Sequence, residues 1–222
     1  MIALITARSG SKTLPGKNVK LLAGKPLLCW SIESALAAGL DPVVSSDSQS
    51  YLDLAERYGA RGLLRPESLA QDGTPHFDVI VHAVQALGNP TEMVLMQPTC
   101  PFRRTEDVRQ AIDVFMKNDL DSMIHVVPVP EEYHPDVTLQ MVDGKVVMAS
   151  GIPVKYRIKR RQDHRPAWVP SGGLYCFKTR NLMYGNFYGD RCGVFEVAET
   201  VNINDQADWT KAELIAKTWR QD

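Results

Sequence analysis

The chain has 222 residues, a formal net charge of −1 at pH 7 and an apolar fraction of 44%, values typical of a folded domain large enough to bury a substantial core. This near-neutral balance argues against a general nucleic-acid-binding protein, so we expect no nucleic-acid partner. No apolar run approaches the ~20 residues of a membrane span, and the opening MIALITARSG lacks a signal-peptide profile. We therefore expect a cytoplasmic protein with no membrane partner.

The first forty residues predict a buried strand, a basic glycine-containing loop and a helix. Ala3 to Thr6 form an apolar run suited to a strand, and Pro26 to Ala38 have the apolar spacing of an amphipathic helix. The residues of this helix that we expect to face the core are Leu27, Trp30, Ile32, Ala35 and Leu36.

The loop between this strand and this helix has the composition of a phosphate-binding loop. Glycine lets the main chain approach an oxyanion closely, and Arg8, Lys12 and Lys17 supply charge that balances a triphosphate. The spacing fits neither the dinucleotide fingerprint GxGxxG nor the sequence GxxxxGK[ST]. A solvated basic surface loop ahead of a helix is the alternative interpretation.

Strand and helix patterns then alternate along the chain. The predicted strands cover 42–46, 62–64, 93–96 and 122–127, and the predicted helices cover 50–58, 77–87 and 106–117. Repeated units of this length predict an α/β fold, with a mostly parallel, doubly wound sheet covered by helices on both faces. The loops at 6–18, 45–48 and 97–103 each follow a strand, so we expect them at one edge of the sheet, where ligands bind in such folds.

The pattern changes after Pro128. Asp143 and Gly144 lie at the centre of a predicted hairpin over 137–148, because this dipeptide readily takes the positive φ angles of a tight turn. The strongly basic stretch YRIKRRQDHRP follows, and it is either a solvated segment or a functional arm. We therefore expect a single domain over 1–222 with an inserted hairpin and basic arm at about 129–168.

These motifs, in this order, closely resemble those of the cytidylyltransferases that activate nonulosonic acids, the CMP-sialic acid synthetase family. The resemblance rests on the opening loop ARSGSKTLPGKN and, further along, on VVSSDS, LLRPESLAQD, LMQPTCPFR and PSGGLY, and it covers nearly the whole chain. It implies the Rossmann-like fold of nucleotide-sugar transferases. It also implies transfer of CMP from CTP to the anomeric hydroxyl of a sialic-acid-like sugar acid, release of pyrophosphate, and Mg²⁺ as cofactor, with Mn²⁺ able to replace it.

The resemblance also implies roles for individual residues. Arg8 and Lys17 would act in catalysis by neutralising the departing pyrophosphate, while Asn18 and Arg65 would lie at the cytidine. The remaining predicted nucleotide-binding residues are Ala7, Ser9, Gly10, Lys12 and Asp72. The predicted acceptor-binding residues are Gln97, Thr99, Arg161, Tyr175, Phe187 and Tyr188. Arg161 belongs to the basic arm, which the resemblance assigns to a homodimer with shared active sites. In the alternative interpretation Arg65 is a salt-bridged loop residue and the aromatic residues belong to the core.

The chain departs from the family pattern near its end. Where family members commonly carry an Asp-x-Asp pair, this sequence has Asn202 and Asn204, followed by Asp205. An amide oxygen can coordinate Mg²⁺, but it brings no charge and cannot act as a general base. Either Asp205 or Asp72 takes part of that role, or the triphosphate itself holds most of the metal. The candidate metal ligands are Asn202, Asn204 and Asp205, of which Asp205 is also a candidate catalytic residue.

Three functions are open at this point. The first is a CMP-nonulosonate synthetase, which the ordered loops support. The second is another sugar-phosphate or cofactor nucleotidyltransferase, since NIND ahead of a helix is similar to the ending of other enzymes on this fold. The third is a non-catalytic nucleotide-binding homologue, which the lost carboxylate pair suggests. Val137 and Val169 stand where sialic acid enzymes typically carry Lys and Arg, so the acceptor's identity is open as well.

Overall fold

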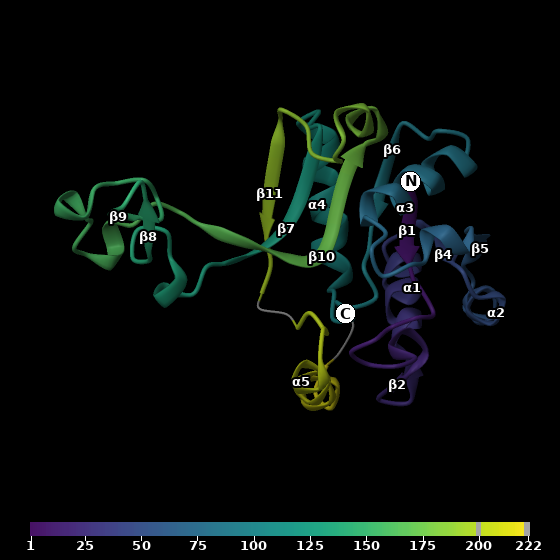
Figure 1. The fold of residues 1–222 in the computed structure, drawn as a ribbon. Helices are drawn as coiled ribbons and strands as arrows, with labels where there is room; N and C mark the ends of the chain where they lie inside the picture. Colours follow the sequence, from purple (N-terminus) through teal and green to yellow (C-terminus); the bar gives the residue numbers. More distant parts are fainter. Residues whose placement is uncertain (199–200, 220–222) are drawn as a thin grey trace.

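The computed structural model describes residues 1–198 and 201–219, and within them the chain builds one central sheet of seven strands (Figure 1). The strand order is β11-β7-β10-β6-β1-β4-β5. The strands are β1 (Ile2–Thr6), β4 (Asp41–Ser46), β5 (Arg61–Leu64), β6 (Glu92–Leu95), β7 (Ser122–Pro128), β10 (Trp168–Lys178) and β11 (Cys192–Glu196). All pairings are parallel except those of β10, which runs antiparallel to both β6 and β7. The prediction of a mostly parallel α/β sheet is confirmed.

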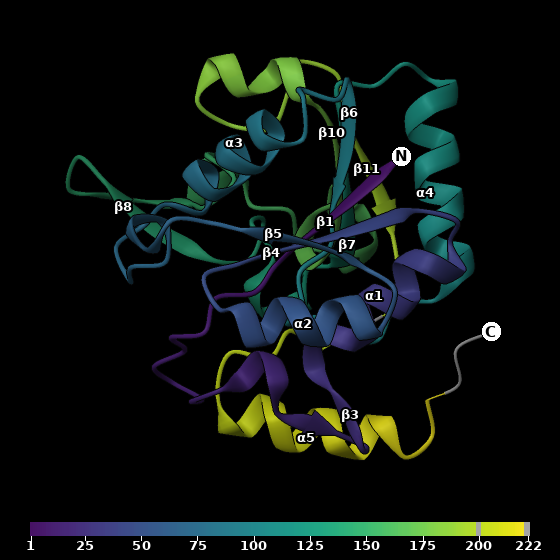
Figure 2. The ribbon, with the colours of Figure 1, turned by 90° about the vertical axis from the view of Figure 1, so that its right-hand side faces the viewer.

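Helices cover both faces of this sheet (Figure 2). On one face pack α1 (Leu27–Ala37), α2 (Gln49–Arg57) and α4 (Thr105–Lys117). On the other face α3 (His76–Ala86) packs its buried side against β1 and β6. A separate apolar cluster joins α5 (Gln206–Ala216) to the loop after β1 and to the small strand β2 (Leu21–Leu22), which pairs with β3 (Lys25–Pro26). Among the described residues, no helix combines the length and apolar character needed to cross a membrane.

The predicted helices and strands agree with the observed bounds to within about two residues, but one predicted core position is wrong. Leu36 keeps 44% of its surface exposed, whereas the neighbouring Ala35 is fully buried. In the last turn of α1, Ala35 takes the inward position, and Leu36 lies beside Gly59. Neighbouring helix residues point about 100° apart, so Leu36 lies at the margin of the buried face and part of its side chain meets water.

Between β7 and β10 the chain leaves the body as a long projection, residues 129–167, which we call the arm (Figure 1). It carries the hairpin of β8 (Leu139–Val142) and β9 (Lys145–Met148), whose turn residues Asp143 and Gly144 have φ angles of 49° and 72°. The predicted hairpin is therefore confirmed. The base of the arm is fastened by Asp136, a buried carboxylate that accepts a hydrogen bond from Arg165 at 2.7 Å.

Candidate functional site

A cavity of about 620 Å³ opens at the carboxyl-terminal edge of the sheet, a volume within the range of small-molecule sites. Its walls come from the loop after β1, the segment between β5 and α3, the loop after β6 and the residue Asn204. The predicted site residues that line it are Arg8, Lys12, Lys17, Asn18, Arg65, Asp72, Gln97, Thr99 and Asn204. Parallel strands thus bring residues from four separate stretches of sequence into one cavity.

One wall of the cavity is strongly basic. Arg8 and Lys12 both pair with Asp72, at 2.8 Å and 2.5 Å. Bonds from Lys12 and Arg8 lower the pKa of the Asp72 carboxyl below its usual range. Lys17 donates from Nζ to the main-chain carbonyl of Ile203 at 2.8 Å, and burial together with the charge of Arg8 lowers its pKa. Because Asp72 is the only carboxylate among the described residues of this lining, the wall carries an excess of positive charge suited to an anion.

The shape of the basic loop depends on a glycine and an amide. Gly16 has a φ of +64°, a left-handed conformation that starts the short helical turn Lys17–Val19. The buried Asn18 side chain donates from Nδ2 to the carbonyl of Arg8 at 2.9 Å. The loop is therefore closed on itself, with the side chain of Lys17 turned to the cavity.

Three predicted nucleotide-binding residues of this loop are not part of the lining. Ala7 is fully buried, and its main-chain N–H donates to Ser45 at 2.9 Å. Ser9 donates to Asp47 from both its N–H and its hydroxyl. The Cβ position of Gly10 has open space around it, so this glycine leaves room near the basic wall.

Arg65 fits both of its predicted interpretations. Its side chain is only 3% exposed, it lines the cavity, and its Nη2 lies 3.8 Å from an Asp47 carboxylate oxygen. Burial lowers the pKa of Arg65, and Asp47 opposes that shift. The guanidinium is thus a paired loop residue and a cavity residue at once.

Two residues of this region were missed by sequence reasoning, namely Asp47 and His76. His76 begins α3 and lines the cavity, with its Nε2 2.9 Å from the hydroxyl of Thr6. Burial and the neighbouring Arg65 lower the pKa of His76, which favours the neutral imidazole. A usable signal was present for Asp47, because it stands directly after a predicted strand at the edge where ligands bind.

Gln97 and Thr99 reach the cavity on the loop after β6. The main chain of this loop is held from two sides. The buried Arg103 donates to the Gln97 carbonyl, and the N–H of Ile203 donates to the Thr99 carbonyl at 2.8 Å. Their side chains are therefore presented from a fixed backbone.

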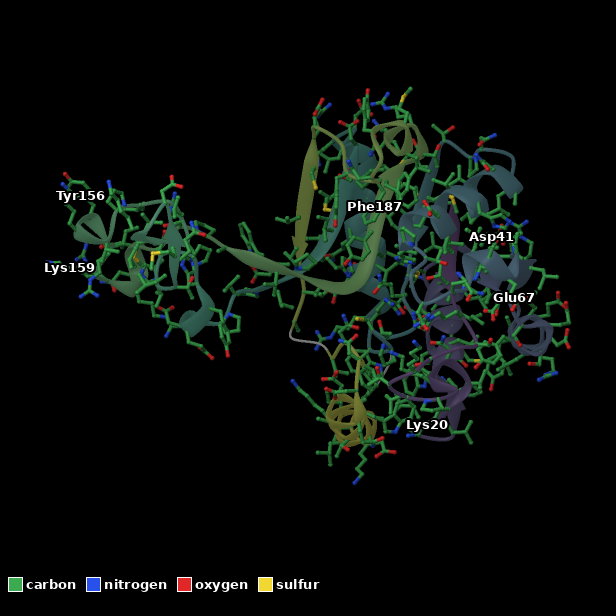
Figure 3. All side chains as sticks on the ribbon, in the orientation of Figure 1. Lys20, Asp41, Glu67, Tyr156, Lys159 and Phe187 are labelled. Atoms are coloured by element: carbon green, nitrogen blue, oxygen red, sulfur yellow. The ribbon has the colours of Figure 1, made fainter. Side chains whose placement is uncertain are left out.

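Three predicted acceptor-binding aromatic residues lie elsewhere. Tyr175 is buried on β10 and packs edge to face on Phe187, with ring centroids 5.4 Å apart, and Phe187 in turn contacts Tyr188. Asn181 donates to both the Phe187 carbonyl and the carbonyl of Asp121, which precedes β7. This loop therefore lies at the amino-terminal edge of the sheet (Phe187 in Figure 3). Tyr175 is therefore a core residue and Phe187 packs against that core, whereas Tyr188 is 39% exposed. None of the three lines the cavity.

Arg161 lies on the arm, outside the cavity of its own chain. Its Nε pairs with Glu131 at 3.0 Å, and its side chain is largely exposed. Figure 3 shows the far end of the arm, marked by Tyr156 and Lys159, well away from the body. Arg161 therefore does not reach the cavity of its own chain in this structure.

Of the three predicted metal ligands near the end of the chain, one lines the cavity and two do not. Asn204 lines it, whereas the amide of Asn202 packs against Gly172, where a Cβ would lie 2.9 Å from Nδ2. Asp205 is the N-cap of α5, and its carboxylate accepts the N–H of Asp208 at 2.9 Å in a reciprocal capping box. The structure thus places the Asp205 carboxylate at a helix end and outside the lining.

The residues present do not form a carboxylate site for Mg²⁺. Across the described ranges, no three His, Cys, Asp or Glu side chains are grouped so that they could hold a metal. Asp72 is paired with two cations, and Asp205 caps a helix. Asn202 offers a buried Oδ1 without a hydrogen-bond partner, which is a single neutral oxygen where Mg²⁺ prefers charged ones.

Comparison with known proteins identifies relatives along nearly the whole chain. The chain is 29% identical over 209 residues to the N-acylneuraminate cytidylyltransferase of Streptococcus agalactiae serotype III, which covers 91% of this chain and 49% of that protein. It is 30% identical to the protein of that name from Escherichia coli O18:K1:H7, over 97% of this chain and 52% of that protein. The chain therefore spans about half the length of these two relatives.

A third relative and a solved structure match over nearly their full lengths. The CMP-N,N'-diacetyllegionaminic acid synthase of Legionella pneumophila is 31% identical over 97% of this chain and 95% of that protein. The structure of CMP:2-keto-3-deoxy-manno-octonic acid synthetase complexed with CTP has a TM-score of 0.72, with 21% identity over 98% of this chain and 99% of that one. This likeness shows the fold. The cytidylyltransferase family model matches residues 2–143, more than half of the chain, so the chain belongs to the cytidylyltransferase family.

Proposed function

We propose that the protein transfers CMP from CTP to the anomeric hydroxyl of a nonulosonic, sialic-acid-like sugar acid and releases pyrophosphate. The observation that carries this proposal is the cavity itself, in which the basic wall of Arg8, Lys12 and Lys17 faces the same space as the buried Arg65. A basic wall suits a triphosphate, and a buried polar side chain at the same cavity suits a base. The names of the relatives support the sugar-acid acceptor.

In this reaction the acceptor's hydroxyl oxygen forms a bond to the α-phosphorus of CTP. The bond from that phosphorus to the oxygen of the β-phosphate breaks, pyrophosphate leaves, and the hydroxyl proton is released to water. Negative charge grows on the leaving group, so cations beside it lower the barrier. We propose that Arg8 and Lys17 supply these cations and that Gln97 and Thr99 orient the acceptor beside the phosphate, because all four residues line the cavity.

The cofactor is part of the proposal. We propose that Mg²⁺, or Mn²⁺ in its place, enters bound to the triphosphate, because the described residues provide no carboxylate cluster for it. Bound there, the ion neutralises phosphate oxygens. Asn204 is the tail residue that we expect to approach the ion, since it lines the cavity.

We also propose a cytoplasmic homodimer in which the arm of one copy reaches the cavity of the other. Support comes from uncovered apolar side chains on the arm, where Leu139 is 60% exposed, Met141 67% and Tyr156 66%. Arg161 on the same arm is a cation able to grip a carboxylate with two parallel bonds.

Pyrophosphate release tests the function. The protein is mixed with one nucleoside triphosphate, Mg²⁺ and one acceptor from a panel of N-acetylneuraminic acid, N,N'-diacetyllegionaminic acid and 2-keto-3-deoxy-manno-octonic acid. We expect release with CTP and at least one sugar acid, and none without an acceptor. Faster release with another nucleotide and a sugar phosphate would favour the second class of enzyme. Tight CTP binding without release from any acceptor would favour a non-catalytic protein.

A further inference from the structure

Asp47 does not line the cavity, but its carboxylate contacts Ser9, on the loop of the basic wall, and lies near Arg65, which lines the cavity. It follows β4, and its side chain is 14% exposed. One carboxylate oxygen, Oδ1, accepts the N–H of Ser9 at 3.0 Å, and the other, Oδ2, accepts the Ser9 hydroxyl at 2.5 Å. Ser9 belongs to the loop after β1, next to the basic wall, so Asp47 fixes that loop through two bonds to one residue.

The same carboxylate also faces Arg65. The oxygen that accepts the Ser9 N–H lies 3.8 Å from Arg65 Nη2, and the Arg65 side chain is 3% exposed. A nearly buried guanidinium needs a nearby opposite charge, because burial removes the water that stabilises it. The charge of Arg8 lowers the pKa of Arg65, whereas the Asp47 carboxylate raises it and so stabilises the charged guanidinium. Removing the Asp47 charge would therefore leave Arg65 facing another cation.

The main chain reinforces this link. The N–H of Arg65 donates to the Ser46 carbonyl at 2.9 Å, and the Ser46 hydroxyl accepts the N–H of Ser48 at 3.1 Å. These bonds fix the backbone on both sides of Asp47, so its carboxylate has a defined position from which to hold two side chains. Asp47 therefore has a fixed backbone, and its carboxylate interacts with Ser9 and Arg65.

We propose that Asp47 is a positioning residue that holds Ser9 on the phosphate side and Arg65 on the base side in fixed relation, so that the cavity recognises base and triphosphate as one unit. This inference rests on the proposed function for the identity of the nucleotide. Asp47 acts through its two partners, and it touches neither base nor phosphate.

Nucleotide binding by calorimetry tests this proposal, with CTP, UTP and CMP as probes. The ratio of CTP to UTP affinity reports the base side, and the ratio of CTP to CMP affinity reports the phosphate side. We expect Asp47→Asn, which keeps the shape of the side chain, to weaken CTP binding about tenfold or more and to lower both ratios. Ser9→Ala should lower only the CTP to CMP ratio. Asp41→Asn is the matched control, because Asp41 pairs with Arg61 at 2.6 Å on the exposed end of the same strand.

A merely structural role predicts a different pattern. If Asp47→Asn lowers the melting temperature but leaves both ratios at their wild-type values, or alters only one of them, the proposal is wrong. Asp47→Glu covers the case in which Asp47→Asn does not fold. It keeps the charge beside Arg65 but displaces Ser9, so it should retain the CTP to UTP ratio better than the CTP to CMP ratio, and equal losses would overturn the proposal. Wild-type protein that prefers another nucleotide would contradict the proposed function instead, and the Asp47 variants are then compared on that nucleotide and its monophosphate.

Discussion

At the scale of single residues, Lys17 is a cation held in the lining of the cavity, where it can bind an anion. Its ammonium is partly buried, it donates to the Ile203 carbonyl at 2.8 Å, and it lies close enough to Arg8 for the two charges to repel. Both burial and Arg8 lower the pKa of Lys17. A bound triphosphate relieves that repulsion, and it competes with Asp72, the exposed carboxylate that pairs with Arg8 and Lys12.

The first prediction concerns these cations. Arg8→Ala and Lys17→Ala should each lower kcat/KM by about 100-fold or more, because the missing charge is needed most as pyrophosphate departs. Pyrophosphate release at varied CTP measures the effect, and circular dichroism checks the fold. Arg61→Ala is the control, since this surface arginine pairs with Asp41 away from the cavity. Wild-type rates in both cavity variants would remove these residues from the reaction.

The second prediction concerns Asn204. Asn204→Asp places a carboxylate in the lining of the cavity, and Mg²⁺ binds a carboxylate better than an amide. The variant should therefore reach half-maximal rate at a lower Mg²⁺ concentration. Metal titration at saturating CTP with a confirmed acceptor measures this. An unchanged titration curve would mean that residue 204 stays out of the metal's reach.

At the scale of elements, the start of α5 explains what Asp205 does for the fold. Its carboxylate accepts the N–H of Asp208, and the Asp208 carboxylate in return accepts the N–H groups of Asp205 and Asn204. Such a capping box satisfies main-chain donors that a helix leaves unpaired at its first turn. The cap fixes Asn204 at the edge of the cavity, so the helix end and the site are coupled.

The third prediction separates capping from metal binding at this position. Asp205→Ala should cost about 1 kcal/mol of stability and lower the melting temperature by about 2–4 °C, with little change in the Mg²⁺ titration. Asp205→Asn should recover most of the stability, because Asn is also a good N-cap. If both variants lose activity while their melting temperatures match the wild type, Asp205 is a ligand or catalytic group instead.

The fourth prediction concerns β7. His125 is 2% exposed, stacks on Phe195 at 5.5 Å and faces the buried Arg103, and burial followed by Arg103 lowers its pKa to about 3. The unfolded chain takes up a proton below about pH 6.5, whereas the folded chain does not until the pH nears that lowered value. The free energy of unfolding should therefore fall as the pH drops through this window, by up to about 1.4 kcal/mol per pH unit from this group.

Urea unfolding of the wild type and of His125→Phe at several pH values between 4.5 and 7 measures this effect. The acidic residues contribute alike to both proteins, so the difference between the two curves isolates the histidine. We expect a shallower pH dependence in His125→Phe. Parallel curves would show that His125 is protonated at the same pH in the folded and unfolded chains.

At the scale of the whole molecule, the arm is the feature that projects from the body formed by the sheet and its helices. It leaves the body after the carboxyl end of β7, a strand that does not line the cavity (Figure 1), and it exposes Arg161 together with apolar side chains. Exposed apolar side chains on an extended element are unfavourable in water, and such a surface is typical of an interaction site. This is the physical basis for the proposed dimer.

The fifth prediction tests sharing of active sites between two copies. Lys17→Ala damages the cavity and Arg161→Ala damages the arm, so each homodimer should be weakly active. In a mixed dimer, one site combines an intact cavity with an intact arm. Co-expression of the two variants should therefore restore about a quarter of wild-type activity, because about half of the dimers are mixed and each has one intact site. Activity no higher than the mean of the two variants would contradict a shared site.

Much of the fold could be predicted because its determinants are local. The apolar run of β1, the glycine and lysines of the loop after it and the Asp143-Gly144 turn each act through their immediate neighbours. Parallel topology then brings the loops that follow strands to one edge, which is why Arg8, Lys17 and Gln97 were expected near each other and are found in one cavity.

What the sequence by itself determined is thus the alternation of elements, the basic loop and the edge of the sheet at which it lies. Only the tertiary structure decided that β10 enters the sheet antiparallel between β6 and β7, that Phe187 packs on Tyr175 at the opposite edge, and that Asp47 holds both Ser9 and Arg65. These are pairings between segments far apart in the chain. No local propensity encodes them, because their free energy comes from burial and charge compensation that exist only once the sheet has assembled.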